Sequence, residues 1–463
     1  MYVNQYRRQW LILITLCIGE IGNSLCISLQ SPLYPREARE KGVSASEYSL
    51  VFGIFQLVNF IISPIYGKNI SRIGPKRLLM IGTFSTGTNV ILFGLLDKIE
   101  GHYAFFVASL IIRVIEGLSS AAYFTTTAAI LPTVMPQGAS MAFAILRVSF
   151  GVGFIVGPAL GGFLYELGGY SLPFLVMGLN LYVSGVVVFF LIDTDSSLKG
   201  RAICDGSYKE LFKSRGVVIT IASLVTASLN IGFLQSILEP HLKQFGLRPF
   251  HVGLVFIIGG TLYSASAPMW GWICKCRMGS KIVAVIGILL HILAFTFIGP
   301  APFIPCETML WLVGIGLVLY GLGNGAQLVA SYPNALNYAI SSGCPDNIET
   351  HGLISGLWAS SFALGSFIGP SIAGFLFDNV GMRNACLFII GINSVLILVV
   401  IVYLFLFDDT DERYQRLSAI DESTHLLSTN SIGTVYAGNI RTAAPTDYLK
   451  DTAFEVSNKV STT

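Results

Sequence analysis

The feature that most constrains this chain is a succession of twelve apolar segments, each long enough to cross a bilayer as a helix. A backbone in lipid must satisfy its own hydrogen bonds, so such segments are expected to be helical. Of the 463 residues, 53% are hydrophobic and only 12% are charged, against about 25% charged in soluble domains. The segments run over residues 10–33, 47–66, 78–96, 103–131, 141–165, 172–192, 216–239, 251–273, 281–300, 308–332, 351–377 and 384–407. We therefore predict an all-α membrane protein with twelve transmembrane helices.

The twelve segments form two similar sets of six. Glycines and a proline recur at a constant offset in the fifth and eleventh segments: Gly153, Gly157, Pro158 and Gly161 match Gly365, Gly369, Pro370 and Ala373. Glycines four apart make a smooth helix face that another helix can approach closely. We interpret this face as a gating motif, with static close packing as the alternative. We predict two pseudo-symmetric six-helix bundles, 1–192 and 216–407, a pattern typical of one transporter architecture. A cytosolic linker, 193–215, joins them, and a disordered cytosolic tail, 408–463, follows.

Most Lys and Arg residues outside the apolar segments fall on the side of the membrane that carries the N-terminus. The positive-inside rule then places both termini and the central linker in the cytosol, together with the sequon Asn69-Ile70-Ser71. The net charge of +2, with no basic cluster, gives no indication of a nucleic-acid partner. Cys274 and Cys276 lack the spacing of a zinc site, and we expect no metal.

Four segments carry polar side chains at steps of three and four residues, which share one helix face. They are Glu20, Asn23 and Gln30 in the first, Arg113, Glu116, Ser120, Tyr123 and Thr127 in the fourth, Ser228, Gly232, Gln235 and Glu239 in the seventh, and Tyr320, Asn324, Gln327, Ser331, Asn334 and Tyr338 in the tenth. Polar groups in hydrocarbon are costly, so we predict that these faces line a central cavity. Hydrogen bonding between helices is the alternative. The nearly polar-free sixth and twelfth segments are expected to face lipid or to pack peripherally.

The charged side chains inside the segments are the candidate functional groups. Glu20 lies about 15 Å into its helix, near the bilayer middle, where it carries a proton, balances a cationic substrate, or pairs with a base. Arg113 and Glu116, three residues apart, are expected to pair with each other.

The remaining ionisable residues have less defined roles. Glu239 is either at a cavity mouth or at a solvated helix end. Arg147 is close enough to the cytosolic end of its helix for its side chain to extend into water. His291 and His351 are expected to stand alone and to be structural.

Three motifs resemble those of the major facilitator superfamily, and the resemblance covers residues 10–407. They are "GKNISRIGPKR" at 67–77, Arg113-x-x-x-Gly117, and Gly153-x-x-x-Gly157-Pro158-x-x-Gly161-Gly162. The resemblance implies proton coupling through the second motif and antiport through the third. Within the superfamily the chain looks most similar to the vesicular amine transporters, and nearest the vesicular polyamine branch. The stretches "SPLYPREAREKGVS", "GFLQSILEPHL" and "GLISGLWASSFALGSFIGPSIAGFL" carry this likeness.

A motif in the tail adds to the resemblance, and four positions depart from the family pattern. "ESTHLL" holds Glu422, Leu426 and Leu427 in the acidic dileucine pattern that sorts membrane proteins to endosomes, lysosomes and synaptic-type vesicles. The chain departs from the family pattern at Ser71 and Lys275, where loop acids are usual, at Gln235, where relatives often have Asp, and at Arg147, where the polyamine branch is expected to have an acid.

Together these features predict a secondary active transporter, not an enzyme, that works by alternating access. We expect a monomeric, proton-coupled antiporter that moves an organic cation, polyamine or monoamine, into acidic vesicles. Glu20 and Glu116 would exchange protons, the proton gradient would replace any cofactor, and sorting adaptors would bind the tail. The membrane is expected to be vesicular or endolysosomal, with the plasma membrane as an alternative. Alternative functions are export of drugs or neutral solutes, or a non-transporting receptor or scaffold.

Overall fold

The computed structural model describes residues 2–135, 138–191, 208–246, 249–275, 279–302 and 308–406. The described residues fold into helices: α1 Tyr2–Glu40, α2 Ala45–Ile73, α3 Pro75–Gly94, η1 Leu96–Lys98, α4 His102–Val134, α5 Ala139–Gly168, α6 Ser171–Leu191, α7 Tyr208–Lys213, α8 Arg215–Leu242, η3 Lys243–Phe245, α9 Pro249–Ile273, α10 Gly279–Ile298, α11 Leu310–Ser341 and α12 Ile348–Leu406. The predicted all-α class is confirmed.

The prediction of twelve membrane-spanning helices is also confirmed for the described part of the chain. Several boundaries differ from expectation. The first, second and tenth spans continue to Glu40, Ile73 and Ser341, past the predicted ends at residues 33, 66 and 332.

The last two segments form one element, α12, whose helical backbone is interrupted at Gly381 (φ 75°, ψ 170°). A left-handed φ suits glycine, which has no Cβ to clash there. This break lies at the start of the last span, Asn379–Leu406, shortly after the span Ile348–Phe377 ends.

The linker predicted at 193–215 is partly helical. Its end forms the short helix α7, in which Leu211 is buried and Phe212 is exposed. Burial of one apolar side chain against the neighbouring helices is a physical reason for this turn to be ordered. Residues 192–207 and the predicted tail 408–463 lie outside the described residues.

Local sequence signals explain where α2 begins and how the chain turns between α2 and α3. Ser44 caps α2, because its side chain accepts a hydrogen bond from the Glu47 backbone N–H. The Glu47 carboxylate in turn accepts from the Ser44 backbone N–H, which completes a capping box. These hydrogen bonds from Ser44 hold the pKa of Glu47 below its usual value. At the other end, Gly74 adopts φ 94° and Pro75 begins α3, where its missing N–H costs nothing.

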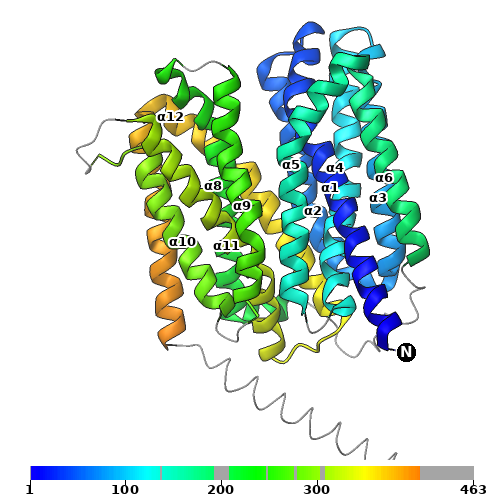
Figure 1. Ribbon diagram of the computed structural model, residues 1–463, viewed down its shortest axis with the longest axis vertical. Helices are drawn as coiled ribbons and strands as arrows, with labels where there is room; N and C mark the ends of the chain where they lie inside the picture. Colours follow the sequence, from blue (N-terminus) through cyan, green and yellow to red (C-terminus); the bar gives the residue numbers. More distant parts are fainter. Residues whose placement is uncertain are drawn as a thin grey trace, which may run out of the picture. The chain divides into compact units, whose positions relative to one another are not determined.

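Figure 1 shows α1–α6 gathered on one side and α8–α12 on the other, here called the first and second halves. We call the membrane side on which α1 begins the N side. The halves meet mainly where α12 packs on α2 and α4 and where α5 packs on α9, with a smaller contact between α5 and α11. Ser360 Oγ in α12 donates to the Phe60 carbonyl in α2 at 2.7 Å. Between α5 and α9, a Cβ on Gly260 of α9 would lie 2.9 Å from Ile155 of α5.

The repeated glycine face packs within each half. A Cβ at Gly153 of α5 would collide with Ser24 Oγ of α1, and a Cβ at Gly365 of α12 would collide with Ser228 Oγ of α8. Only glycine therefore permits these two close helix approaches. The same serine–glycine contact recurs in both halves, as the sequence duplication predicts.

The sixth and twelfth spans expose large apolar side chains, as predicted for lipid-facing helices. Phe190 in α6 is 78% exposed and Phe405 at the end of α12 is 85% exposed. In a bilayer such surfaces contact acyl chains, which are as apolar as the side chains themselves.

The predicted orientation can be tested by glycosylation. With the N side cytosolic, Asn69 near the end of α2 should carry no glycan in eukaryotic cells. Gly42→Asn creates a sequon with Ser44 in the turn between α1 and α2, on the opposite side, and should be glycosylated. Asparagine tolerates the left-handed backbone at this position (φ 80°). Gel mobility before and after glycosidase treatment shows which asparagine carries a glycan. A glycan on Asn69 would show that the orientation is opposite to the predicted one.

Candidate functional site

The site is centred on a buried ion pair between α1 and α5. Arg147 Nη2 donates to Glu20 Oε1 at 2.5 Å. Glu20 is fully buried and Arg147 is 5% exposed. The expectation that Arg147 extends into cytosolic water is therefore wrong, because its guanidinium compensates the charge of a carboxylate that has no water around it. Of the roles considered for Glu20, pairing with a base is the one found.

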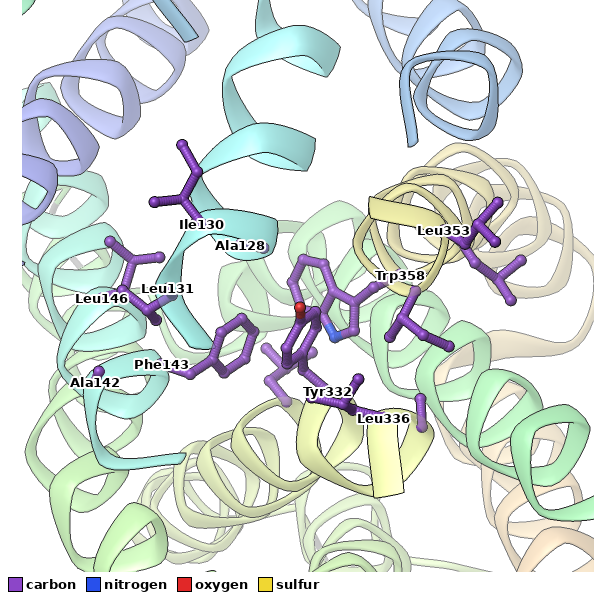
Figure 2. Close-up of a cluster of buried hydrophobic side chains, with 14 of the residues drawn as sticks. Ala128, Ile130, Leu131, Ala142, Phe143, Leu146, Tyr332, Leu336, Leu353 and Trp358 are labelled. Carbon is purple, nitrogen blue, oxygen red and sulfur yellow. The ribbon is translucent and has the colours of Figure 1, made fainter. Parts of the chain in front are cut away.

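Aromatic rings from both halves surround Arg147. Its guanidinium carbon lies 5.2 Å from the ring centre of Phe143, 5.5 Å from Phe150 and 5.1 Å from Trp358, distances typical of cation–π contacts. Phe143 also stacks on Tyr332 of α11 with ring centres 4.9 Å apart. Figure 2 shows the rings of Phe143, Tyr332 and Trp358 grouped together, from α5, α11 and α12. Because Trp358 and Tyr332 belong to the second half, the ion pair lies at the junction of the halves.

Further contacts fix the surroundings of this pair. The Trp358 indole N–H donates to Ser331 Oγ of α11 at 2.7 Å. Tyr123 of α4 donates its hydroxyl to the Leu16 carbonyl of α1 at 3.3 Å, one turn before Glu20. Tyr263 of α9 packs against Gly151, one turn after Arg147. Helices from both halves thus hold the pair from several directions.

A second ion pair lies within the first half. As predicted, Arg113 and Glu116 of α4 pair with each other, at 3.2 Å. Gln30 of α1 donates its amide to the other Glu116 oxygen at 3.0 Å, and all three side chains are buried. The Arg113 guanidinium lies 5.0–5.4 Å from three ring centres, those of Phe52, Phe55 and Phe93.

The polar face of α11 is bonded to neighbouring helices, so the cavity hypothesis does not describe most of it. His291 of α10 lies 3.0 Å from Asn324 Oδ1, and Asn334 donates to the Ser280 carbonyl at 3.0 Å. Gln327 donates to Ser223 of α8 at 3.3 Å. Tyr320 meets His291 and Phe295 edge-on, and Tyr338 meets Tyr403. Because α11 has neighbours all round, its polar groups can find partners between helices.

The face of α8 makes similar contacts within the second half. Ser228 Oγ donates to the Val225 and Leu224 carbonyls, and a Cβ on Gly232 would lie 2.7 Å from Pro370. Gln235 is exposed. The side chains of Glu239 and Pro158 lie outside the described residues, as do Glu422, Leu426 and Leu427 of the predicted sorting signal.

The two histidines do not stand alone. His291 lies between the Gly287 carbonyl and Asn324. His351 Nε2 is 2.6 Å from Asp346 Oδ1, and this bond holds the pKa of Asp346 below its usual value.

Sequence reasoning missed the amide pair Asn230–Asn393, whose side chains bond each other at 3.2 and 3.3 Å between α8 and α12. The sequence signal that could have revealed this pair is the presence of one asparagine in each of two apolar segments. Within the described part of the chain, no group of three His, Cys, Asp or Glu side chains is placed to hold a metal ion.

Comparisons with known proteins agree with this architecture. The sequence model described as Major Facilitator Superfamily matches residues 16–347. The human "MFS-type transporter SLC18B1" is 30% identical over 381 residues, covering 82% of this chain and 83% of the relative. The rat protein of that name is 28% identical over 416 residues, covering 89% and 90%.

A solved structure, of the human organic anion transporter MFSD10 (TETRAN), matches with a TM-score of 0.67 and 17% identity, over 85% of this chain and 99% of that one. At this identity the likeness concerns the fold alone. The sequence matches confirm the resemblance to the superfamily and to its vesicular amine transporter branch.

A double-mutant cycle tests the coupling in the central ion pair. Arg147→Gln leaves a buried carboxylate without its base and should destabilise the protein by about 3–5 kcal/mol. The double variant Glu20→Gln/Arg147→Gln removes both charges and should recover most of that loss. Unfolding of the purified variants in detergent measures the cycle. Additive losses from the two single variants would show that the pair is not coupled.

Proposed function

This chain belongs to the major facilitator superfamily and is an integral multi-pass membrane transporter, and from that premise we propose that it is a proton-coupled antiporter that moves organic cations into acidic vesicles. The observation that carries the proposal is the Glu20–Arg147 pair, a buried carboxylate at the junction of the two halves. Polyamines and monoamines are the cation classes that the family resemblance suggests.

Alternating access requires the halves to part on one membrane side at a time. On the N side, Gly67 of α2 lies directly against Gly352 and Gly356 of α12. The Ser360–Phe60 and Gly260–Ile155 contacts, in contrast, lie near the middles of their helices. The Phe143–Tyr332 stack and the Trp358 contact extend this closure to the central ion pair. With a cytosolic N side, this arrangement is closed toward the cytosol and corresponds to the lumen-facing stage of the cycle.

Protonation of Glu20 would couple protons to the substrate. An ionised carboxylate attracts a cation, whereas the neutral acid does not. Exposure to the acidic lumen would protonate Glu20 and release the substrate, and return to the cytosolic side would discharge the proton. Glu116 has the same chemistry but lies inside the first half, paired with Arg113 and Gln30, so we assign it a supporting part.

The proposed membrane is vesicular or endolysosomal, with both termini in the cytosol. The tail motif at 422–427 would then face cytosolic sorting adaptors. We propose that the monomer is the transporting unit, because each half supplies one wall of the site.

Uptake into proteoliposomes tests proton coupling. Wild-type protein should accumulate labelled amine when the vesicle interior is acidic, and a protonophore should abolish accumulation. Glu20→Gln cannot ionise and should lower gradient-driven uptake at least about tenfold, within the range of one proton-transfer group. Glu166→Gln, at an exposed position of α5, is the matched control. Uptake that ignores the gradient would refute the coupling.

The glycine face of α5 gives a second test. We propose that close contact of α5 with α1 lets the helices shift during gating. A Cβ at Gly157 would collide with Ser28 Oγ, whereas a Cβ at Gly162 would meet nothing within 4 Å. Gly157→Leu should therefore abolish uptake. Gly391→Leu, at an exposed glycine of α12 outside the motif where a Cβ also meets nothing within 4 Å, should leave uptake near the wild-type rate. Wild-type uptake by well-folded Gly157→Leu, judged by gel filtration and unfolding temperature, would reject the gating role.

A further inference from the structure

The central ion pair keeps one free acceptor and one free donor. Glu20 Oε1 is bonded to Arg147 Nη2 and the Tyr123 hydroxyl lies near the same carboxylate, but Glu20 Oε2 and Arg147 Nε make no well-formed hydrogen bond among the described residues. Both atoms are buried, and unpaired buried polar atoms are costly. Asn23, one turn along the same face of α1, also has a free, buried amide N–H. The site thus offers a negative and a positive hydrogen-bonding position side by side.

The buried charges of the membrane-spanning helices have no acidic surplus. Among described residues, the buried acids are Glu20, Glu37 and Glu116, and the buried bases other than histidine are Arg113, Arg147 and Lys281. A ligand with several positive charges would therefore add uncompensated charge to a region of low dielectric constant, where repulsion is strong. It would also meet the guanidinium of Arg147 beside Glu20, the carboxylate that the described residues place at the junction.

The Arg113 pair has free atoms too, Arg113 Nε and Gln30 Oε1. Its aromatic surroundings, however, come from α2 and α3, in the first half alone. The Arg147 guanidinium contacts Trp358 of the second half. Transported substrates in this architecture bind between the repeats, so the Glu20–Arg147 pair is the site where a ligand can contact both halves.

We propose that the substrate is a zwitterion that carries one ammonium and one carboxylate group, and that Arg147 determines this specificity. The ammonium donates to Glu20 Oε2, and the carboxylate accepts from Arg147 Nε. Each buried charge then has an opposite partner, and the net charge of the site is unchanged on binding. This inference rests on the proposed transport function and replaces its simple amine cations by net-neutral molecules in which a carboxylate balances the ammonium group.

A matched set of four-carbon compounds tests the inference by binding alone. They are 4-aminobutyrate, 1-aminobutane, butyrate and 1,4-diaminobutane, which differ only in the charges at their ends. Purified wild-type protein is titrated with each compound, and the rise in unfolding temperature reports binding to the folded state. The dissociation constant of 4-aminobutyrate should be at least about tenfold lower than that of 1,4-diaminobutane.

Two results would overturn the inference: equal or tighter binding of 1,4-diaminobutane, or no binding of any of the four compounds. Arg147→Lys keeps the positive charge and should keep the preference for 4-aminobutyrate. Arg147→Gln should shift the preference toward 1,4-diaminobutane. If that single variant does not fold, Glu20→Gln/Arg147→Gln removes both charges without leaving one unpaired, and its preference should fall to roughly one. An unchanged preference in the double variant would also contradict the inference.

Proton-coupled transport and zwitterion specificity can be rejected independently of each other. Uptake of 4-aminobutyrate that is independent of the proton gradient would reject proton coupling and leave the zwitterion specificity in place. Gradient-driven uptake of 1,4-diaminobutane in preference to 4-aminobutyrate would confirm coupling and overturn the specificity.

Discussion

Glu20 sits in the middle of a membrane-spanning helix, where an ionised carboxylate is tolerated only with an opposite charge beside it. Arg147 provides that charge from α5, and aromatic rings close around its guanidinium. This one interaction connects α1 and α5 of the first half with Trp358 of the second. In the proposed mechanism, a change in the protonation of Glu20, or in the groups bonded to Arg147, would act directly on the contact between halves that alternating access requires to move.

Close packing of small residues holds the helices together inside each half. Ser24 and Gly153 bring α1 and α5 together, and Ser228 and Gly365 do the same for α8 and α12. Lipid supplies no hydrophobic force between helices. Small side chains therefore stabilise helix pairs by allowing dense van der Waals contact. The two halves use such contacts at equivalent positions, Gly153 and Gly365, on either side of one asymmetric charged centre.

The sequence predicted more of the fold than of the site. Twelve spans, the duplication and the lipid-facing sixth and twelfth spans follow from hydropathy and residue spacing, because each depends on short-range sequence alone. The pairing of Arg113 with Glu116 was predictable for the same reason, being three residues apart on one helix. Arg147 was misplaced because its partner is 127 positions away, and helix periodicity carries no information about which helix lies opposite.

The polar face of α11 shows the same limit. Steps of three and four residues place Asn324, Gln327 and Asn334 on one face, but they do not say whether water or another helix faces them. The structure supplies His291, Ser223 and Ser280 as partners. What the sequence alone determined is the number of spans, their repeat and the residues that need compensation in lipid, since these follow from composition and local geometry. Only the tertiary structure decided which charge meets which, because a buried ion pair is formed by helix packing across long sequence separations.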